Sequence, residues 1–220
     1  MTEKSHGMFD RAAWLTRAVA ALALCVVHVA SGQTIVDEWA SVQAPPAPVL
    51  KPVKVDRHTT ALLLLDLNGQ SCNQQRRPRC VTSIPKLKML LDSARMAGIP
   101  VAFTLSFTAG GDRGDMLKEI LPVGDEPVFS SRLDKFVDTE LEKFLKGKGV
   151  HNVIIVGTAA HGAVLYTVTG AVTRGFKVIV PVDGVSADNA YAEQYTVWHF
   201  ANAPLVSPSI TLTSLRDLKF

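Results

Sequence analysis

Continuous apolar runs and helical stripes of apolar residues alternate along the chain from Thr59 onward. The run Ala61–Asp66 (ALLLLD) has the composition of a strand that is buried on both faces of a sheet. Further strands are predicted at Pro100–Leu105, near Pro127–Ser130, at Asn152–Val156 and at Phe176–Val182. Because helical patterns separate these strands, the sequence predicts an α/β fold in which helices cover both faces of a mainly parallel sheet.

Between the strands, apolar residues recur at helical spacing. This spacing predicts helices over Pro85–Ala97, from Val137 to Leu145, from Val164 to Val172 and over Asp188–Ala201. Pro85 is expected in the first turn of its helix, where the missing N–H costs nothing. Gly175 is expected to end the third helix in a left-handed conformation.

The last of these helices has two candidate N-caps, Ser186 and Asp188. Tyr191, Tyr195 and Trp198 follow at i, i+4 and i+7. The simplest interpretation of that spacing is the face of the helix that packs on the core.

The first thirty-two residues have the layout of a secretory signal peptide. Three basic residues precede the apolar run Ala18–Ala30, and the small residues Ser31 and Gly32 follow it. The run is shorter than the roughly 20 residues that cross a bilayer. An uncleaved anchor or lipid attachment at Cys25 are the alternatives. We therefore expect export to a bacterial periplasm or the medium, with no membrane contact after cleavage.

After the signal peptide, residues 33–56 form a proline-rich lead-in, and residues 57–220 form the folded domain. The composition is that of one ordinary globular domain, with 47% hydrophobic and 20% charged residues. The net charge is only +3, and the basic residues are scattered along the chain. This pattern gives no electrostatic footprint for nucleic acid.

Removal of the signal peptide also removes Cys25 and leaves two cysteines, Cys72 and Cys80, in the segment SCNQQRRPRC. In an oxidising compartment such a pair predicts a disulfide. Two buried free thiols are the alternative. The chain-entropy estimate for so short a loop is about 2.5 kcal/mol of stabilisation.

Three segments resemble, in order, the blocks of the isochorismatase-like cysteine hydrolase family: LLLLDLNGQ, SSRLDKFVDTELEKFL and VIIVGTAAHGAVLYTVTGAVTRGFKVIVPVDGVSA. The resemblance spans about Thr59 to Ser186. It implies a three-layer α/β/α, Rossmann-like fold and a family triad of aspartate, lysine and cysteine. In such a sheet, ligands bind at the carboxyl ends of the strands.

The resemblance assigns the triad positions residue by residue. Asp66 matches the family's aspartate. The lysine position is Ser130, because the family's F-x-x-T-x-L block begins at Phe136, and Lys135 is expected to point elsewhere. The cysteine position is Ala163. The resemblance therefore implies a divergent member that lacks the catalytic cysteine and lysine.

The isochorismatase branch of the family also has a small residue at the cysteine position, after a pair that resembles Ala160-His161. That branch hydrolyses a vinyl ether by acid-assisted addition of water, and its aspartate donates the proton. Asp66 fits this role if burial raises its pKa; otherwise it only caps a loop. His161 either binds an anion at the helix N-terminus or is structural, and Ser130 is either a spectator or a nucleophile that needs a base.

Four further residues are candidates for substrate binding. Asn68 follows Asp66 at the end of the first strand, and the amides of Gly162 and Ala163 could form an oxyanion hole. Arg132 matches an arginine often seen in the family block. Arg132 itself could pair with a substrate carboxylate, or it could pair only with an acidic residue at the surface. The histidines have no ligand-like spacing, so the sequence supports no metal, and it contains no glycine-rich loop for a nucleotide cofactor.

The first functional hypothesis is an exported hydrolase that acts on a small amide, carboxylate or enol-ether substrate. The alternatives are a non-catalytic binding or scaffold protein and a lyase or isomerase that uses Asp66. The expected partner is a small molecule, with specificity in loops such as Thr108–Leu121. Because relatives often assemble through helices beside the site, a homo-oligomer also remains open.

Overall fold

The computed structural model describes residues 34–106 and 113–220. The whole predicted signal peptide, residues 1–32, therefore lies outside the described residues. The chain divides into two units, Met1–Ala44 and Pro45–Phe220. In the described part of the first unit, the short helix α1 (Ile35–Glu38) begins after Thr34, whose N–H and hydroxyl both donate to the Asp37 carboxylate at 2.9 Å.

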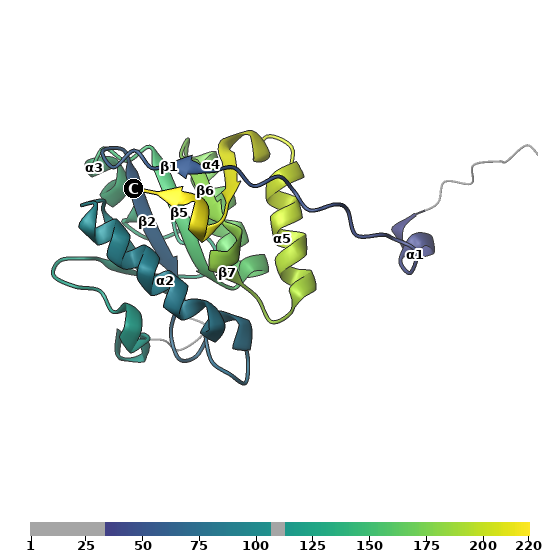
Figure 1. Ribbon diagram of the computed structural model, residues 1–220, viewed down its shortest axis with the longest axis horizontal. Coiled ribbons are helices and arrows are strands. Elements are labelled where there is room, and N and C mark those ends of the chain that lie inside the picture. The colour runs from purple at the N-terminus through teal and green to yellow at the C-terminus, as the bar shows by residue number, and fades with distance from the viewer. Residues whose placement is uncertain (1–33, 107–112) are drawn as a thin grey trace, which may run out of the picture. The chain divides into compact units, whose positions relative to one another are not determined.

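The second unit is built on a parallel sheet with helices on both faces (Figure 1). Its strands are β1 (Val53–Lys54), β2 (Thr60–Leu65), β3 (Val101–Ser106), β4 (Val128–Ser131), β5 (Asn152–Thr158), β6 (Lys177–Pro181), β7 (Val185–Ser186), β8 (Ile210–Thr213) and β9 (Leu218–Lys219). Its longer helices are α2 (Pro78–Met96), α3 (Leu141–Gly147), α4 (Leu165–Thr173) and α5 (Ala190–Asn202). The predicted fold class is confirmed.

The large sheet has the strand order β4-β3-β2-β5-β6-β8, all neighbours are parallel, and β7 pairs with the end of β5. β1 and β9 form a separate parallel pair. Strand β2 is buried at every position. Its side chains alternate between two hydrophobic clusters, as the pleat requires: Leu63 and Leu65 belong to one, Leu62 and Leu64 to the other.

Helix α2 covers one face of the sheet, and α3, α4 and α5 supply the cluster on the other face. The apolar side chains Leu87, Leu91 and Ala94 of α2 are fully buried. This division explains the three layers: each helix buries one apolar stripe against a sheet that is apolar on both faces.

Helix α2 begins seven residues earlier than predicted. Pro78, and not Pro85, occupies the first turn, so Pro85 lies inside the helix. The hydroxyls of Thr82 and Ser83 donate to the carbonyls of Pro78 and Cys80 at 3.0 and 2.7 Å. A proline inside a helix normally costs about 3 kcal/mol, so the sequence pattern favoured a start at Pro85. Here the helix continues through Pro85, and Cys80, Ile84 and Leu87 on either side of it are buried.

Helices α3 and α5 also differ from the prediction. α3 begins at Leu141, since Asp138 has a positive φ of 57° and breaks the helical path after Val137, which is exposed. α5 is capped by Asn189, whose side chain accepts from the N–H of Ala192 at 2.9 Å. Neither Ser186 nor Asp188 caps it.

The aromatic face of α5 is exposed, which corrects the prediction that it packs on the core. Tyr191, Tyr195 and Trp198 are 71%, 42% and 42% exposed. The buried residues of this helix are Ala192, Thr196 and Phe200, which lie one or two positions along. Small side chains at the first two of these positions let the helix approach the sheet, and the spacing alone does not choose between two adjacent stripes.

Candidate active site

The order of the strands places a topological switch between β2 and β5. From β2 the chain adds β3 and then β4 on one side, and it returns to add β5 on the other side of β2. In open α/β sheets, ligands bind outside the carboxyl ends of the strands at such a point. Asp66 follows β2 there, and the segment Ala160–Val164 follows β5.

Asp66 is held at this edge by its neighbours in β3. Its N–H donates to the Thr104 carbonyl at 3.0 Å, and its Oδ1 accepts from the Thr104 hydroxyl at 3.4 Å. The residue is 4% exposed and has a positive φ of 54°. A non-glycine residue in the left-handed region is uncommon and is often found at functional sites.

The cation beside Asp66 is Lys135, which corrects the expectation that this side chain points elsewhere. Its Nζ lies 2.9 Å from Asp66 Oδ1 and donates to the Arg132 carbonyl at 2.8 Å. Lys135 is fully buried. Ser130, at the position where the resemblance places the lysine, is exposed. The site therefore keeps an aspartate–lysine pair, with the lysine supplied five residues farther along the chain.

The loop that carries Lys135 is fixed by hydrogen bonds from its own hydroxyl groups and from α4. Ser131 Oγ donates to the Val137 carbonyl at 2.7 Å, and Thr139 Oγ1 donates to the Lys135 carbonyl at 2.6 Å. The N–H of Lys135 donates to Thr167 Oγ1 at 3.2 Å. These hydrogen bonds hold the turn after β4, and the Lys135 side chain extends from that turn to Asp66.

A second set of contacts closes the same loop against α4. Asp134 pairs with Arg174 at 3.1 Å, and the Arg174 guanidinium lies 4.9 Å from the centre of the Phe136 ring. A Cβ atom on Gly170 would lie 2.5 Å from the Asp134 carboxylate oxygens. Glycine at position 170 is therefore what allows α4 to approach this close.

Burial dominates the electrostatics of the Asp66–Lys135 pair. It raises the pKa of the Asp66 carboxyl, and the positive charges of Lys135 and Arg77 together with hydrogen bonds from Lys135 and Thr104 oppose that rise. Burial also lowers the pKa of Lys135, and Asp66 opposes that shift. The pKa values of Asp66 and Lys135 therefore approach each other. Transfer of a proton between the two side chains costs less here than it does between the same groups in water.

The segment after β5 lacks a nucleophile. Ala163, where the resemblance places the cysteine, is 5% exposed and carries only a methyl group. Within the π-helical turn η4 (Ala160–Val164), the Gly162 N–H donates to the Ala159 carbonyl at 2.9 Å. This N–H is already paired, so of the two amides expected to form an oxyanion hole only that of Ala163 stays a candidate.

Gly157 sets the spacing of this edge. It pairs with Leu65, immediately before Asp66, and has a φ of 125°. A Cβ atom here would lie 2.2 Å from the Leu65 carbonyl oxygen. Only glycine permits β2 and β5 to meet this closely beside the site. The peptide bond between Thr158 and Ala159, one residue later, is cis.

The other sequence candidates lie mainly at the surface. His161 and Arg132 are exposed, and among the described residues their side chains make no hydrogen bond or ion pair. Arg132 takes part in the site through its carbonyl, which accepts from Lys135. Asn68 is fully buried: its Oδ1 accepts from the Ser71 N–H at 2.8 Å, and among the described residues its Nδ2 has no hydrogen-bond partner.

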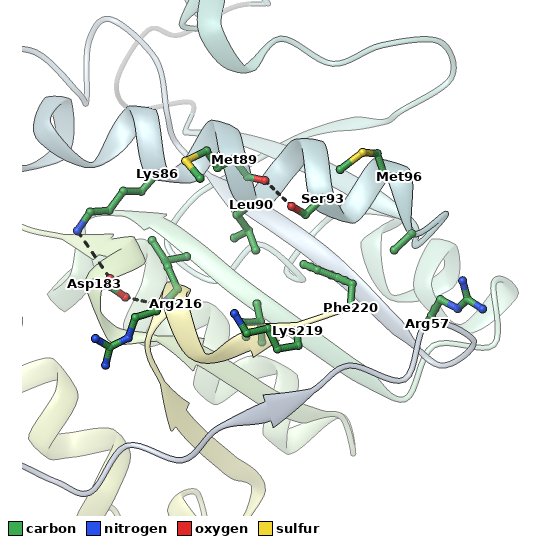
Figure 2. A pocket seen from close by; sticks show the side chains of 13 residues that line it. Arg57, Lys86, Met89, Leu90, Ser93, Met96, Asp183, Arg216, Lys219 and Phe220 are labelled. Carbon is green, nitrogen blue, oxygen red and sulfur yellow. Dashed lines mark hydrogen bonds and ion pairs between the residues drawn. The ribbon is translucent and has the colours of Figure 1, made fainter.

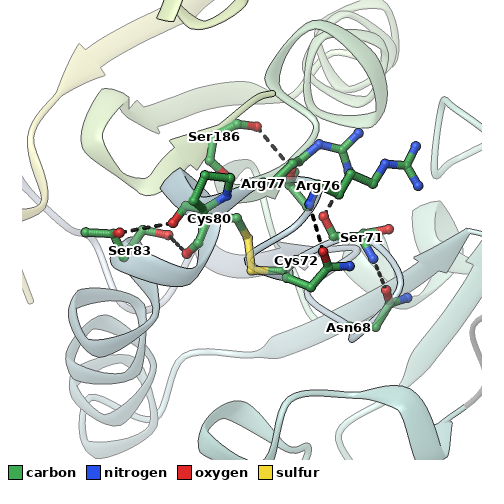
Figure 3. The surroundings of a disulfide bond; sticks show 12 residues. Asn68, Ser71, Cys72, Arg76, Arg77, Cys80, Ser83 and Ser186 are labelled. Carbon is green, nitrogen blue, oxygen red and sulfur yellow. Dashed lines mark hydrogen bonds between the residues drawn. A yellow bond between two sulfur atoms is a disulfide. The ribbon is translucent and has the colours of Figure 1, made fainter. Parts of the chain in front are cut away.

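The predicted disulfide is present, with Cα atoms of Cys72 and Cys80 separated by 5.4 Å (Figure 3). It brackets Arg77, a residue that the sequence did not single out. Arg77 is 7% exposed, its Nε lies 2.5 Å from Asp188 Oδ1, and its Nη1 donates to the Ser71 carbonyl at 3.0 Å. Its charge opposes the rise in the pKa of Asp66. Three arginines in a short cysteine-bracketed loop were the available signal.

Two cavities of the described residues lie away from this edge. One of about 950 Å³ lies between α2 and the last residues of the chain (Figure 2), and one of about 460 Å³ lies beside α3. Neither is lined by Asp66, Ser130, His161 or Ala163. Within residues 34–106 and 113–220 no group of three or more metal-ligating side chains occurs, and no helix is long and apolar enough to span a membrane.

The fold and the buried aspartate–lysine pair at its switch point define a three-layer α/β protein with a candidate active site. Residues 60–211 match the isochorismatase domain family, and the chain belongs to that family. The curated N-carbamoylsarcosine amidase of Arthrobacter sp. is 28% identical over 47% of this chain and 49% of its own, so the chain spans about half the length of that relative.

Two solved structures show the same fold. An isochorismatase-like hydrolase from Alkaliphilus metalliredigens superposes with a TM-score of 0.63 at 21% identity, covering 72% of this chain and 96% of that one. N-carbamoylsarcosine amidase from Thermoplasma acidophilum superposes with a TM-score of 0.61 at 20% identity, covering 71% and 96%. At these identities the superpositions establish the fold alone.

Proposed function

We propose that this protein is a hydrolase that adds water to a small substrate by acid catalysis from Asp66, without a covalent cysteine intermediate. The observation that carries the proposal is the buried Asp66–Lys135 pair. The absence of a covalent step is inferred from the resemblance, which assigns the nucleophile position to Ala163. Among amides, carboxylates and enol ethers, this arrangement favours an enol ether. Direct attack of water on an amide would have to expel an amine, which is a poor leaving group.

The chemistry balances with the groups present. Protonated Asp66 donates its proton to the alkene carbon of the enol ether. Water adds to the adjacent carbon, which bears the ether oxygen, and its released proton returns to the Asp66 carboxylate. The resulting hemiketal breaks the C–O bond to the ether oxygen as its hydroxyl proton passes to that oxygen, and a carbonyl compound and an alcohol are released. The Lys135 ammonium, 2.9 Å away, stabilises the carboxylate that Asp66 becomes. The unpaired Asn68 Nδ2 is a candidate donor to the substrate.

The test is turnover by purified protein against isochorismate, N-carbamoylsarcosine and a panel of small amides, with products measured by mass spectrometry. Asp66→Asn keeps the shape of the side chain but cannot donate the acid proton. We expect it to lower the rate by roughly 10² or more. Asp125→Asn is the matched control on the surface. An Asp66→Asn variant as active as the parent contradicts the proposal.

A second candidate function is non-catalytic binding on the same scaffold. The observation that favours it is closure of the pair: Lys135 is 0% and Asp66 4% exposed, which leaves little room for a substrate. Absence of turnover across the panel, together with thermal stabilisation by one of its compounds that persists in Asp66→Asn, supports this function over hydrolysis.

We also propose that the protein is exported. The N-terminal pattern of residues 1–32 and the Cys72–Cys80 disulfide support this, since disulfides persist in oxidising compartments. Mature protein from the native host is then expected to begin near Ser31 or Gln33. Full-length chain in the cytosol, with free thiols, contradicts export.

A further inference from the structure

The cavity between α2 and the C-terminal segment Leu215–Phe220 is separate from the Asp66–Lys135 pair and shares no lining residue with it (Figure 2). Its volume of about 950 Å³ is at the upper end of the range of small-molecule sites. Most of its lining is apolar, as in sites that bury the body of a ligand. We therefore asked which ligand the walls and the rim of this groove fit.

One wall is a stripe along α2 that the core does not use. Lys86, Met89, Ser93 and Met96 recur at i, i+3, i+7 and i+10, which places them on one face of the helix. Met89 and Met96 are 71% and 82% exposed. Unbranched, polarisable methionine side chains adapt to apolar ligands of different shapes. This wall can therefore close over a flexible hydrocarbon.

The floor of the groove is the margin of the hydrophobic core. Leu90 and Leu218 are 5% and 6% exposed and belong to the buried cluster beneath α2, against which Leu215 and Phe220 pack. Figure 2 shows Leu90 and Phe220, which both line the groove, between its two ends. A chain that lies along this floor extends the core and loses its contact with water.

The rim is strongly basic. It carries four cationic residues and one acidic residue: Arg57, Lys86, Arg216, Lys219 and Asp183. Lys86 Nζ lies 3.9 Å from Asp183 Oδ2, and Arg216 Nε lies 3.5 Å from Asp217 Oδ1. Arg57 and Lys219 have no ion pair within the described part of the chain. Arg57 lies at the end of the groove opposite the Lys86–Asp183 pair (Figure 2), so that end holds uncompensated positive charge.

We propose that this groove binds a small amphipathic anion, with its acidic headgroup near Arg57 and its hydrocarbon body along Met89, Leu90 and Phe220. Charge complementarity selects the anion, since the rim has four cations to one carboxylate. The apolar floor selects the hydrocarbon. This site does not depend on the proposed hydrolysis, because none of its residues belongs to the Asp66–Lys135 site.

Calorimetric titration of the full chain with decanoate, below the concentration at which it forms micelles, tests the proposal. Acetate supplies the charge without the chain, and decyl maltoside supplies the chain without the charge. We expect saturable binding of decanoate, no detectable binding of acetate, and binding of decyl maltoside at least tenfold weaker. Absence of saturable decanoate binding, or equally tight binding of decyl maltoside, overturns the proposal.

Two variants locate the site. Arg57→Gln removes the headgroup cation, and Met89→Glu places a negative charge on the apolar wall; both residues are exposed, so folding is expected to survive. Each is expected to raise the Kd for decanoate tenfold or more. The matched controls Lys118→Gln and Leu205→Glu lie outside the groove and should change the Kd less than twofold. Parent-like affinity in both Arg57→Gln and Met89→Glu overturns the assignment.

Discussion

Replacing Lys135 by methionine is the most direct test of the buried pair. Lys135 is fully buried, and its Nζ contacts Asp66 Oδ1 at 2.9 Å and the Arg132 carbonyl at 2.8 Å. Methionine fills most of the same volume without a charge. The substitution therefore leaves the Asp66 carboxylate buried without its cation, and removal of one partner of a buried ion pair typically costs about 3–5 kcal/mol.

Asp66 can reduce this cost by taking up a proton. Burial already raises its pKa, and loss of the Lys135 charge removes the main influence that opposes the rise. In Lys135→Met the pKa of folded Asp66 then lies well above the value of 3.8 in the unfolded chain. An acid with a raised folded pKa contributes stability that is present below pH 3.8 and is lost as pH rises to the folded pKa.

The expected result is a destabilisation that grows with pH. Between pH 5 and pH 8, the free energy of unfolding of Lys135→Met should fall relative to the parent by up to about 1.4 kcal/mol per pH unit, the limit for one proton. The assay is urea unfolding at four pH values in that range. Lys118→Met, on an exposed lysine, is the matched control and should stay within about 0.5 kcal/mol of the parent throughout.

Two results would refute this reasoning. A loss below about 1 kcal/mol at pH 8 would mean that Lys135 does not stabilise an ionised Asp66. A large loss that does not vary with pH would mean that the cost comes from packing and not from an unpaired carboxylate. The double variant Asp66→Asn with Lys135→Met separates these outcomes, since it should recover most of the loss if the unpaired charge is the cause.

Three further predictions concern the disulfide, the strand contact and the missing thiol. Reduction of the disulfide should lower the free energy of unfolding by about 2.5 kcal/mol, measured by urea unfolding with and without reductant; no change would contradict its role in stability. Gly157→Ala should destabilise by about 3 kcal/mol or more, because its Cβ meets the Leu65 carbonyl oxygen, whereas Gly147→Ala, which meets nothing within 4 Å, should be nearly neutral by thermal unfolding. Iodoacetamide should leave any hydrolysis unchanged under non-reducing conditions, and strong inactivation would show that a thiol takes part.

The position of Asp66 could be predicted from the sequence, because it ends a run of apolar residues that only a doubly buried strand accommodates. The apolar runs predicted the fold class but not the order of the strands, because a run does not specify which strands are its neighbours in the sheet. The Cys72–Cys80 bridge could be predicted from the short spacing of the two cysteines together with the expected export, and it is present. These features depend on local pattern, and local pattern is what a sequence states directly.

Lys135 could not be placed in this way. The family spacing pointed to Ser130, and the turn that redirects the chain after β4 depends on hydrogen bonds with Thr167, which lies thirty-two residues away. The exposed stripe of α5 was misassigned for a related reason. Its two adjacent stripes, Tyr191 with Tyr195 and Ala192 with Thr196, have the same helical spacing, and only contact with the sheet selects one of them.

The sequence by itself therefore determined the fold class, the acid at the end of the first core strand and the disulfide. The tertiary structure decided which cation meets that acid, that Arg77 acts on it, and that a basic apolar groove opens beside α2. The physical reason is the range of the interactions. Strand burial and loop closure are set by neighbours along the chain, whereas a buried ion pair or a groove joins segments that only the folded sheet brings together.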